Sequence, residues 1–283
     1  MACVVKSADT EEGKRFVSAV SKVLGRSAGL VESLRSLGLS ECMKHVAFDC
    51  EGVDLSRVGT VELLSISFSQ SETYLVDLNG TPCKEIVGAL KELLESEKVL
   101  KIIHDCRMDS DALWHHHSIK LVNIHDTSCF HEVITGSQNS GLNDVLTYNG
   151  IGANTQRDKS VYKYNPRFWA SRPLTQRMIE WASADVDKLL LLAEKQLSAV
   201  SESKKVEAVK KSEAFATSTL KMNVCTGLRV RNPGRFIGKG GTNIRACEKS
   251  TGTLMYQQSA TKTWFVFYNS SSSLEQVKRK MAM

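Results

Sequence analysis

The sequence predicts a mixed-sheet α/β fold followed by a small α+β module, for three reasons. Short apolar runs at 45–49, 61–68 and 74–78 are separated by turn-rich residues, which is typical of three consecutive strands in an antiparallel meander. Helical and strand-like patterns then alternate, which favours helices layered on a mixed sheet. A second group of strand and helix patterns begins after residue 217, beyond a polar stretch.

The elements of the first part can be placed in order along the chain. The stretch TEEGKRFVSAVSKVL at 10–24 has helical spacing and an acidic first turn. After the three strands we expect a helix at 84–97, a strand at 98–103, a helix at 109–117, and a short strand at 120–124 followed by another helix. Residues 137–172 are less periodic. The last helix of this part is expected to begin near Pro173, since proline suits a first helical turn.

We place the first domain at 1–200, a charged linker at 201–216 and the second domain at 217–283. The net charge of +6 is unevenly distributed, because residues 217–283 carry eleven Lys and Arg but two Glu. Their net charge is therefore +9, which leaves −3 for the preceding residues. This asymmetry indicates a polyanionic partner for the basic part, although a solvated basic surface would have the same composition.

The composition argues against several classes of protein. Apolar residues make up 42% of the chain, which is ordinary for a globular protein with a sizeable core. The sequence has no run of 18 apolar residues, so we expect no membrane span and no membrane partner. The eight cysteines lack the spacing of metal-binding pairs, and the first residues do not resemble an export signal. Reduced thiols and a cytoplasmic or nuclear location are expected.

Two carboxylates lie at the end of the first strand of the meander. Asp49 and Glu51 flank Cys50 in HVAFDCEG, and on a strand their side chains project from the same face. Adjacent anions repel each other unless a cation lies between them, and a divalent metal is the usual one. A strand that simply ends in solvent would show the same pattern, so the pair alone leaves both interpretations open.

Two further aspartates are candidates for the same site. Asp109 lies where an apolar strand meets the next helix, but this position also suits a helix cap, and spacing alone does not separate it from Asp105 or Asp111. Asp185 falls on the apolar stripe of the last helix, with Trp181 one turn earlier. A carboxylate there is costly unless it is paired or metal-bound, and a half-exposed position is the alternative.

Three segments resemble the Exo I, II and III motifs of the DEDD 3′→5′ exonuclease superfamily. They are VAFDCEGVDLSR, IIHDCRMDSDAL followed by IHDT, and PRFWASRPLTQRMIEWASADV. The match lies in the RNase D-like branch, near the Egalitarian and exonuclease-domain-containing group, and covers about residues 40–195. It implies an RNase H-like fold and release of 5′-mononucleotides. It selects Asp109, at the motif's distance after His104, and implies that two Mg²⁺ or Mn²⁺ ions are bound by Asp49, Glu51, Asp109 and Asp185.

The chain departs from this family at one catalytic position. The branch has a tyrosine four residues before the last aspartate, which positions the attacking water, whereas this chain has Trp181. Losing such a group typically costs about 10²–10⁴ in rate. The resemblance therefore implies a slow 3′→5′ exonuclease acting on single-stranded RNA, with DNA as the other candidate substrate. The alternative is a catalytically weak or silent RNA-binding adaptor that keeps the exonuclease fold.

A glycine-rich loop is the main feature of the second domain. Residues 236–244 read FIGKGGTNI, so the loop consists of Ile237, Gly238, Lys239, Gly240 and Gly241. Glycines let the backbone approach a phosphate-bearing strand closely, and a helix N-terminus favours anions. A glycine turn between two elements explains most isolated motifs of this kind, so the surrounding elements decide its meaning.

The expected elements around this loop resemble a type I KH domain over about 217–283. A strand is expected at 219–225, a helix at 242–250, two strands in TLMYQQ and TWFVFYN, and a helix from Leu274. KH modules clamp about four nucleotides over the glycine loop. The resemblance implies that the loop binds single-stranded RNA, with Arg231, Arg235 and Arg245 beside it.

Overall fold

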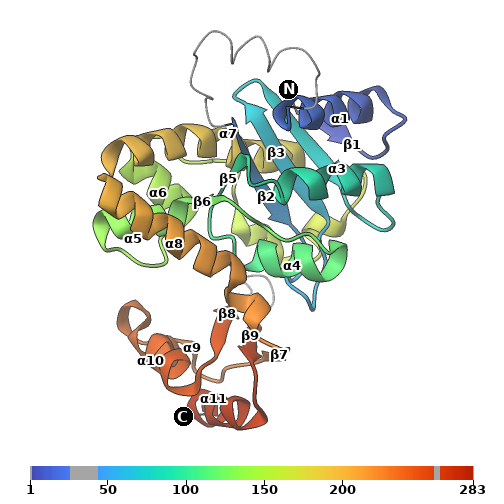
Figure 1. Cartoon of the computed structure of the whole chain (residues 1–283). Coiled ribbons are helices and arrows are strands. Elements are labelled where there is room, and N and C mark those ends of the chain that lie inside the picture. Colours follow the sequence, from blue (N-terminus) through green and yellow to red (C-terminus); the bar gives the residue numbers. More distant parts are fainter. Residues whose placement is uncertain (1, 26–43, 258–261, 283) are drawn as a thin grey trace. The chain divides into compact units, whose positions relative to one another are not determined.

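The structure is a computed structural model that describes residues 2–25, 44–257 and 262–282. The chain forms two compact units (Figure 1). The first consists of residues 1–157 and 169–216, and the second of residues 158–168 and 217–283. The segment 158–168, which we had placed within the first domain, is therefore grouped with the second unit.

A six-stranded mixed sheet forms the centre of the first unit. Its strands are β1 (Cys3–Val5), β2 (Lys44–Glu51), β3 (Leu63–Ser69), β4 (Glu72–Asp77), β5 (Val99–Ile103) and β6 (Ile124–Asp126). They lie in the order β1-β4-β3-β2-β5-β6. β3 is antiparallel to β2 and β4, which confirms the predicted meander. β1 pairs in parallel with β4, β5 with β2, and β6 with β5, so the sheet is mixed.

Helices cover both faces of this sheet (Figure 1). They are α1 (Glu11–Val23), α3 (Lys84–Leu94), α4 (Arg107–His117), α5 (Thr127–Thr135), α6 (Leu142–Tyr148), α7 (Gln176–Ala199) and α8 (Glu202–Ser218). Val46, Phe48 and Cys50 of β2 belong to one core together with residues of α1, α3 and α4. Ala47 belongs to a second core with residues of α6 and α7. Because side chains alternate along a strand, Asp49 projects toward the α7 side.

The long helix α7 begins three residues later than predicted. Thr175 is its N-cap and accepts a hydrogen bond from the backbone N–H of Met178 at 3.3 Å, so Pro173 precedes the helix. The predicted apolar stripe is present. Its buried members include Met178, Ala182, Asp185 and Leu189, and α7 contacts β2, β3, β4 and β5. The stripe therefore carries Asp185 directly onto the sheet.

The predicted linker at 201–216 is a helix packed on the first unit, which corrects the expectation of a solvated connection. Ala208, Ser212 and Ala216 of α8 are buried. The Ser212 hydroxyl donates to the Ala208 carbonyl at 2.8 Å and accepts from the backbone N–H of Asp126 at 3.1 Å. Small residues on this face allow close packing but carry little hydrophobic signal, which is why the composition suggested a linker.

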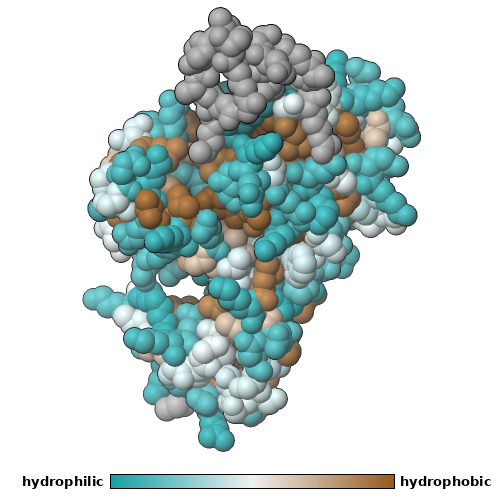
Figure 2. All heavy atoms as spheres, in the orientation of Figure 1, coloured by the Kyte–Doolittle hydropathy of each residue, from teal (hydrophilic) through white to brown (hydrophobic). Residues whose placement is uncertain are grey.

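The described part of the second unit contains a three-stranded antiparallel sheet and three α-helices. Its elements are β7 (Val224–Leu228), α9 (Pro233–Ile237), α10 (Thr242–Thr251), β8 (Leu254–Gln257), β9 (Trp264–Tyr268) and α11 (Ser271–Ala282). β9 lies between β7 and β8. The predicted strand at 219–225 is shifted, since 219–221 form a 3₁₀ turn. On the face seen in Figure 2, hydrophilic and intermediate residues dominate the surface of this unit.

The described cysteines are all free thiols, as predicted, while Cys42 lies outside the described residues. No helix within 2–25, 44–257 or 262–282 has the length and hydropathy that a membrane crossing needs.

A lysine is buried inside the first unit. Lys101 of β5 is fully inaccessible, and its ammonium group donates to the carbonyl oxygens of Ser96 and, at 2.7 Å, of Val99. Burial lowers the pKa of Lys101 to about 7. Between about pH 7 and pH 10, the unfolded chain therefore binds one more proton than the folded chain. The free energy of unfolding of the protein should rise with pH across that range.

Replacing Lys101 with methionine should remove this pH dependence. We expect the free energy of unfolding of the wild type, relative to Lys101→Met, to rise between pH 7 and pH 10 by an amount on the order of a few kcal/mol. Urea unfolding at several pH values measures this difference. Parallel profiles for the two proteins would contradict the lowered pKa.

Candidate active site

Three carboxylates converge at the end of β2. Asp49 and Glu51 come from β2 and Asp185 comes from α7, and one carboxylate oxygen of each lies within 4.8 Å of the other two. Asp185 is fully buried, whereas Asp49 and Glu51 are partly exposed. Three of the four acids singled out from the sequence thus lie together, although they are far apart in the chain.

Asp109 lies beside this cluster in the first turn of α4. Its Oδ1 accepts a hydrogen bond of 3.0 Å from the backbone N–H of Cys50, the residue between the two β2 acids. Its side chain is buried, and burial raises its pKa to about 7. Asp109 is not one of the three residues whose oxygens lie within 4.8 Å of one another, but its charge acts on Asp49.

The cluster is an unfavourable place for uncompensated negative charge. The pKa of Asp49 is raised well above its usual value, chiefly by burial and then by the charges of Glu51, Asp109 and Asp185. The guanidinium of Arg157 acts in the opposite direction. Hard oxygen ligands gathered at such a site suit a divalent cation such as Mg²⁺ or Mn²⁺.

Cys50 shares this environment but turns to the other face of the strand, where it joins the core with α1 and α3. The pKa of its thiol is raised well above the usual value by burial and by the nearby charges of Asp109 and Asp49. Its sulfur is therefore held in the neutral form, and the cluster presents oxygen ligands.

Both oxygens of the Asp185 carboxylate accept hydrogen bonds from neighbouring side chains. The indole N–H of Trp181 donates to Oδ2 at 3.0 Å, and the side-chain amide of Asn154 donates to Oδ1 at 2.9 Å. Arg157 reaches the same Oδ1 with Nη1 at 3.4 Å. Second-layer donors of this kind fix the orientation of a metal-binding carboxylate.

Trp181 is placed to orient Asp185. Its ring is 1% exposed and packs edge-on against Trp169, with the ring centroids 5.4 Å apart. The indole N–H is directed at the carboxylate of Asp185. Trp181 therefore acts on the acidic cluster through its hydrogen bond to Asp185.

Asn154 and Arg157 were not singled out from the sequence. Asn154 is 2% exposed, and its backbone N–H and C=O both bond the side-chain amide of Asn143, at 2.8 and 3.2 Å. Its Oδ1 accepts from the backbone N–H of Gln156 at 3.0 Å, which forms a tight turn before Arg157. Both residues lie in the aperiodic stretch 137–172, where pattern analysis gave no signal.

Asp126, in the IHDT segment, connects two helix starts near the cluster. Its carboxylate accepts from the backbone N–H groups of Asp105 and Cys106 at 3.0 and 2.8 Å, just before α4. It also caps α5 by accepting from the backbone N–H of Ser128 at 2.9 Å. Asp126 thereby fixes the turn that leads into α4 and to Asp109.

His104 is a structural residue rather than a candidate base. Its Nε2 lies 3.1 Å from the Ser140 carbonyl oxygen and its Nδ1 lies 2.9 Å from the Thr127 hydroxyl. A carbonyl can only accept, so Nε2 carries the proton and Nδ1 accepts from Thr127. Burial lowers the pKa of His104, which keeps the ring neutral.

The glycine loop of the second unit joins α9 to α10. Gly238, Gly240 and Gly241 have φ values of +74°, +59° and +78°, a region that other residues rarely adopt. A Cβ at Gly238 would lie 2.6 Å from the Asn243 side chain, and one at Gly241 would lie 2.8 Å from the Arg245 guanidinium. The side chain of Arg245 thus lies against the loop, while Lys239, Arg231 and Arg235 are exposed.

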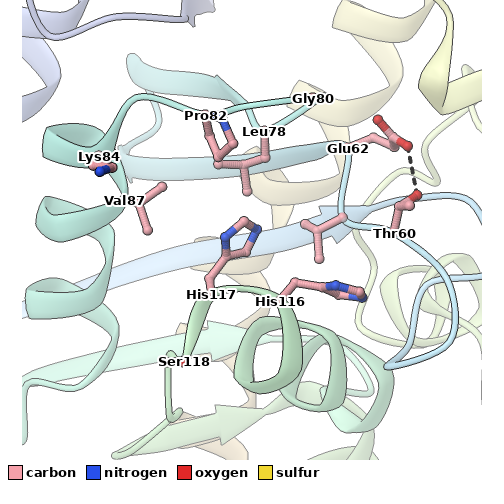
Figure 3. A pocket seen from close by; sticks show the side chains of 11 residues that line it. Thr60, Glu62, Leu78, Gly80, Pro82, Lys84, Val87, His116, His117 and Ser118 are labelled. Atoms are coloured by element: carbon pink, nitrogen blue, oxygen red, sulfur yellow. Dashed lines mark hydrogen bonds between the residues drawn. The ribbon is translucent and has the colours of Figure 1, made fainter.

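A separate hollow of about 640 Å³ lies in the first unit (Figure 3). Its lining includes Val61, Leu78, His116 and His117. Val61 and Leu78 belong to the core that contains the opposite face of β2, and none of the four acids lines the hollow. His116 donates through Nε2 to the Ser56 carbonyl oxygen at 2.9 Å, and His115, His116 and His117 form the last turn of α4.

Residues 28–200, which include all four acids, match the family model described as 3′-5′ exonuclease. The chain belongs to the 3′-5′ exonuclease family. This agrees with the mixed sheet and with the grouping of acids from β2 and α7.

Several known proteins resemble the chain. The mouse piRNA biogenesis protein EXD1 is 27% identical over 157 residues, which are 50% of this chain and 27% of that protein. The crystal structure of Escherichia coli RNase D, described as an exoribonuclease involved in structured RNA processing, matches with a TM-score of 0.57 and 18% identity, over 77% of this chain and 50% of that one. Brucella melitensis NrnC with bound Mg²⁺ matches with a TM-score of 0.51 and 18% identity, over 62% of this chain and 83% of that one.

These similarities establish the fold and the family of the first unit. At 18% identity the two solved structures support the fold. The chain spans about a quarter to two fifths of the length of the EXD1 relatives that it matches.

Removing the indole donor should weaken metal binding by this 3′-5′ exonuclease family member. In Trp181→Phe the ring still packs on Trp169, but Asp185 Oδ2 loses its hydrogen bond. We expect Mn²⁺ affinity to fall about 10-fold, measured by electron paramagnetic resonance of free Mn²⁺. Trp114→Phe is the matched control, because Trp114 is 43% exposed and lies outside the cluster. Equal Mn²⁺ affinities in the two variants would contradict an orienting role for Trp181.

Proposed function

We propose that this protein is a metal-dependent 3′-5′ exonuclease that acts on single-stranded nucleic acid, in particular RNA. The observation that carries the proposal is the convergence of Asp49, Glu51 and Asp185, with Asp109 bonded to the backbone between the two β2 acids. Closely spaced acids, two of them buried here, destabilise a fold unless a cation compensates their charge, so their arrangement supports a cation-binding function.

The four acids are proposed to hold two divalent ions, Mg²⁺ or Mn²⁺. Such a pair, when bound, supplies an activated water and stabilises the leaving oxygen of a phosphodiester. Within the chain, Asp49 and Asp185 would present oxygens to the ions, and Glu51 would also contact the terminal 3′-hydroxyl, as the family resemblance implies. The Cys50 N–H holds Asp109 in place, and Trp181 and Asn154 orient Asp185.

RNA is the proposed substrate because of the relatives that the chain resembles. EXD1 is named for piRNA biogenesis, and RNase D is described as acting in structured RNA processing. Each product would be a 5′-mononucleotide, since hydrolysis adds water across the bond between the terminal phosphorus and the preceding 3′ oxygen.

We further propose that residues 217–283 form a type I KH domain that binds single-stranded RNA. Three features support this proposal: the element order β7-α9-α10-β8-β9-α11, the antiparallel sheet with β9 in the middle, and the glycine loop between α9 and α10. The exposed Lys239, Arg231 and Arg235 and the Arg245 side chain against the loop offer positive charge to phosphates.

The second candidate function is an RNA-binding adaptor with little or no catalysis. The observation in its favour is Trp181, which is buried, lacks a hydroxyl and uses its only donor on Asp185. The water-positioning group of the branch is therefore missing from this place, and we expect the nuclease to be slow.

The first test is release of mononucleotides from single-stranded RNA with a free 3′-hydroxyl, in the presence of Mn²⁺. We expect Asp49→Asn to reduce the rate by at least about 10²-fold, because one cluster ligand loses its charge. Glu194→Gln, an exposed acid on α7, is the matched control and should cleave like the wild type. A wild-type rate no greater than that of Asp49→Asn would reject the enzyme and favour the adaptor.

The same assay with Trp181→Tyr separates the two explanations for a slow rate. A faster variant would indicate that the missing hydroxyl limits catalysis. A slower variant with weaker Mn²⁺ binding would indicate that orientation of Asp185 by the indole matters more.

The proposed KH function is tested by replacing both Lys239 and Gly240 with aspartate in the full chain. We expect binding of a short single-stranded RNA, measured by fluorescence anisotropy, to weaken by at least about 10-fold, since the loop would then repel phosphates. Mn²⁺ binding should not change.

The matched control changes the net charge by the same amount on α11, through Lys278→Glu with Arg279→Gln, both exposed. If this control weakens RNA binding as much as the loop variant does, the loop has no specific role and the tail binds RNA through its overall charge.

A further inference from the structure

Arg157 is a cationic side chain that donates a hydrogen bond to the acidic cluster. Its Nη1 lies 3.4 Å from Asp185 Oδ1, and its side chain is 24% exposed where that of Asp185 is fully buried. Its charge also opposes the raised pKa of Asp49, so it acts on carboxylates from both β2 and α7. A partly exposed guanidinium thus lies beside a group of anions of which Asp185 is fully buried.

The contact between Arg157 and Asp185 differs from two structural arginine pairs of the same unit. Arg57 donates to Asp111 through Nη2 at 2.7 Å and Nε at 3.0 Å. Arg172 donates to Asp77 through Nη2 at 2.6 Å and Nε at 2.9 Å. Those are the short two-pronged bonds of fixed ion pairs. Arg157 reaches Asp185 through one long bond, to an oxygen already bonded by Asn154.

The backbone before Arg157 is held more firmly than the Arg157–Asp185 contact. The Asn143 side chain bonds both backbone groups of Asn154, and Asn154 Oδ1 closes the turn through Gln156. The polypeptide is therefore constrained to bring a guanidinium to the cluster, while that group is only loosely attached to Asp185. This combination suits a residue that changes partners.

A guanidinium and a divalent cation compete for the same carboxylate oxygen. Once the negative charge of the cluster is compensated by bound ions, Arg157 loses most of its attraction to Asp185. A phosphate of the substrate then offers it an anionic partner with matching two-pronged geometry.

On the basis of the proposed exonuclease function, we propose that Arg157 is a catalytic residue that binds the phosphate group cleaved at the 3′ end of the strand. In the metal-free protein it occupies the cluster as a substitute cation. Arg157 stays protonated throughout the reaction and transfers no proton, because a guanidinium does not deprotonate in proteins. Its contribution is to bind the non-bridging phosphate oxygens and stabilise the charge that they gain during hydrolysis.

The test compares Arg157→Gln and Arg157→Lys with Arg15→Gln, a control that removes one exposed arginine of α1. Three quantities are measured on the full chain: Mn²⁺ affinity without nucleotide, affinity for adenosine 5′-monophosphate with Mn²⁺ present, and the rate of RNA cleavage in a single turnover. Thermal unfolding of each variant reports on folding.

We expect Arg157→Gln to bind Mn²⁺ as tightly as the wild type or more tightly, because a competing cation is gone. The same variant should bind the monophosphate about 10-fold or more weakly and cleave RNA about 10²-fold more slowly. Arg157→Lys should recover part of both losses, since it restores the charge but not the two-pronged geometry.

The opposite pattern would overturn the proposal. If Arg157→Gln and Arg157→Lys both lose Mn²⁺ affinity and thermal stability, and monophosphate binding falls only in proportion, Arg157 is a structural partner of Asp185. Failure of the exonuclease proposal is distinguishable from this result. If the exonuclease proposal fails, the wild type would cleave RNA no faster than Asp49→Asn. A selective loss of monophosphate binding in Arg157→Gln would even then show that Arg157 contacts a phosphate.

Discussion

Electrostatic repulsion among closely spaced carboxylates is the constraint on which the organisation of the first unit depends. Asp49 and Glu51 end a strand whose other face lies in the main core, and α7 brings the fully buried Asp185 against them. Such a group is tolerated only where donors or cations compensate it. The surrounding structure supplies donors from four places: the β2 backbone at Cys50, the loop at Asn154, α7 at Trp181, and Arg157.

These compensating groups form two layers with different properties. Asn154, Trp181 and the Cys50 amide are neutral, buried donors at 2.9–3.0 Å, and they fix the carboxylates without occupying a cation's place. Arg157 is charged, partly exposed and more distant. Neutral donors close to the carboxylates, with a charged group farther away, orient these ligands and leave their negative charge available to a cation. Asp126 is likewise bonded by neutral donors, the backbone N–H groups of Asp105 and Cys106 and the hydroxyl of Ser128.

Local patterns in the sequence predicted the parts of this arrangement that are set by periodicity. The alternation of β2 placed Asp49 and Glu51 on one face, and the stripe of α7 revealed Asp185 as a buried acid. Asp109 required the family resemblance, because its neighbours are acids with similar spacing. Asn154 and Arg157 act across about thirty residues from an irregular loop, which leaves no periodic trace. The docking of α8 was missed for a related reason, since its buried face consists of small residues: Ala208, Ser212 and Ala216.

The position of Cys50 has a consequence for how the cluster responds to its chemical surroundings. Cys50 is the residue between Asp49 and Glu51. Burial and the nearby carboxylates nevertheless keep its thiol protonated. Protonated, inaccessible sulfur reacts slowly with peroxide and with alkylating agents, and it is a poor ligand for thiophilic metals. Although Cys50 stands between two of the acids, oxidants should therefore modify it slowly, and its sulfur should not bind zinc or cadmium at this site.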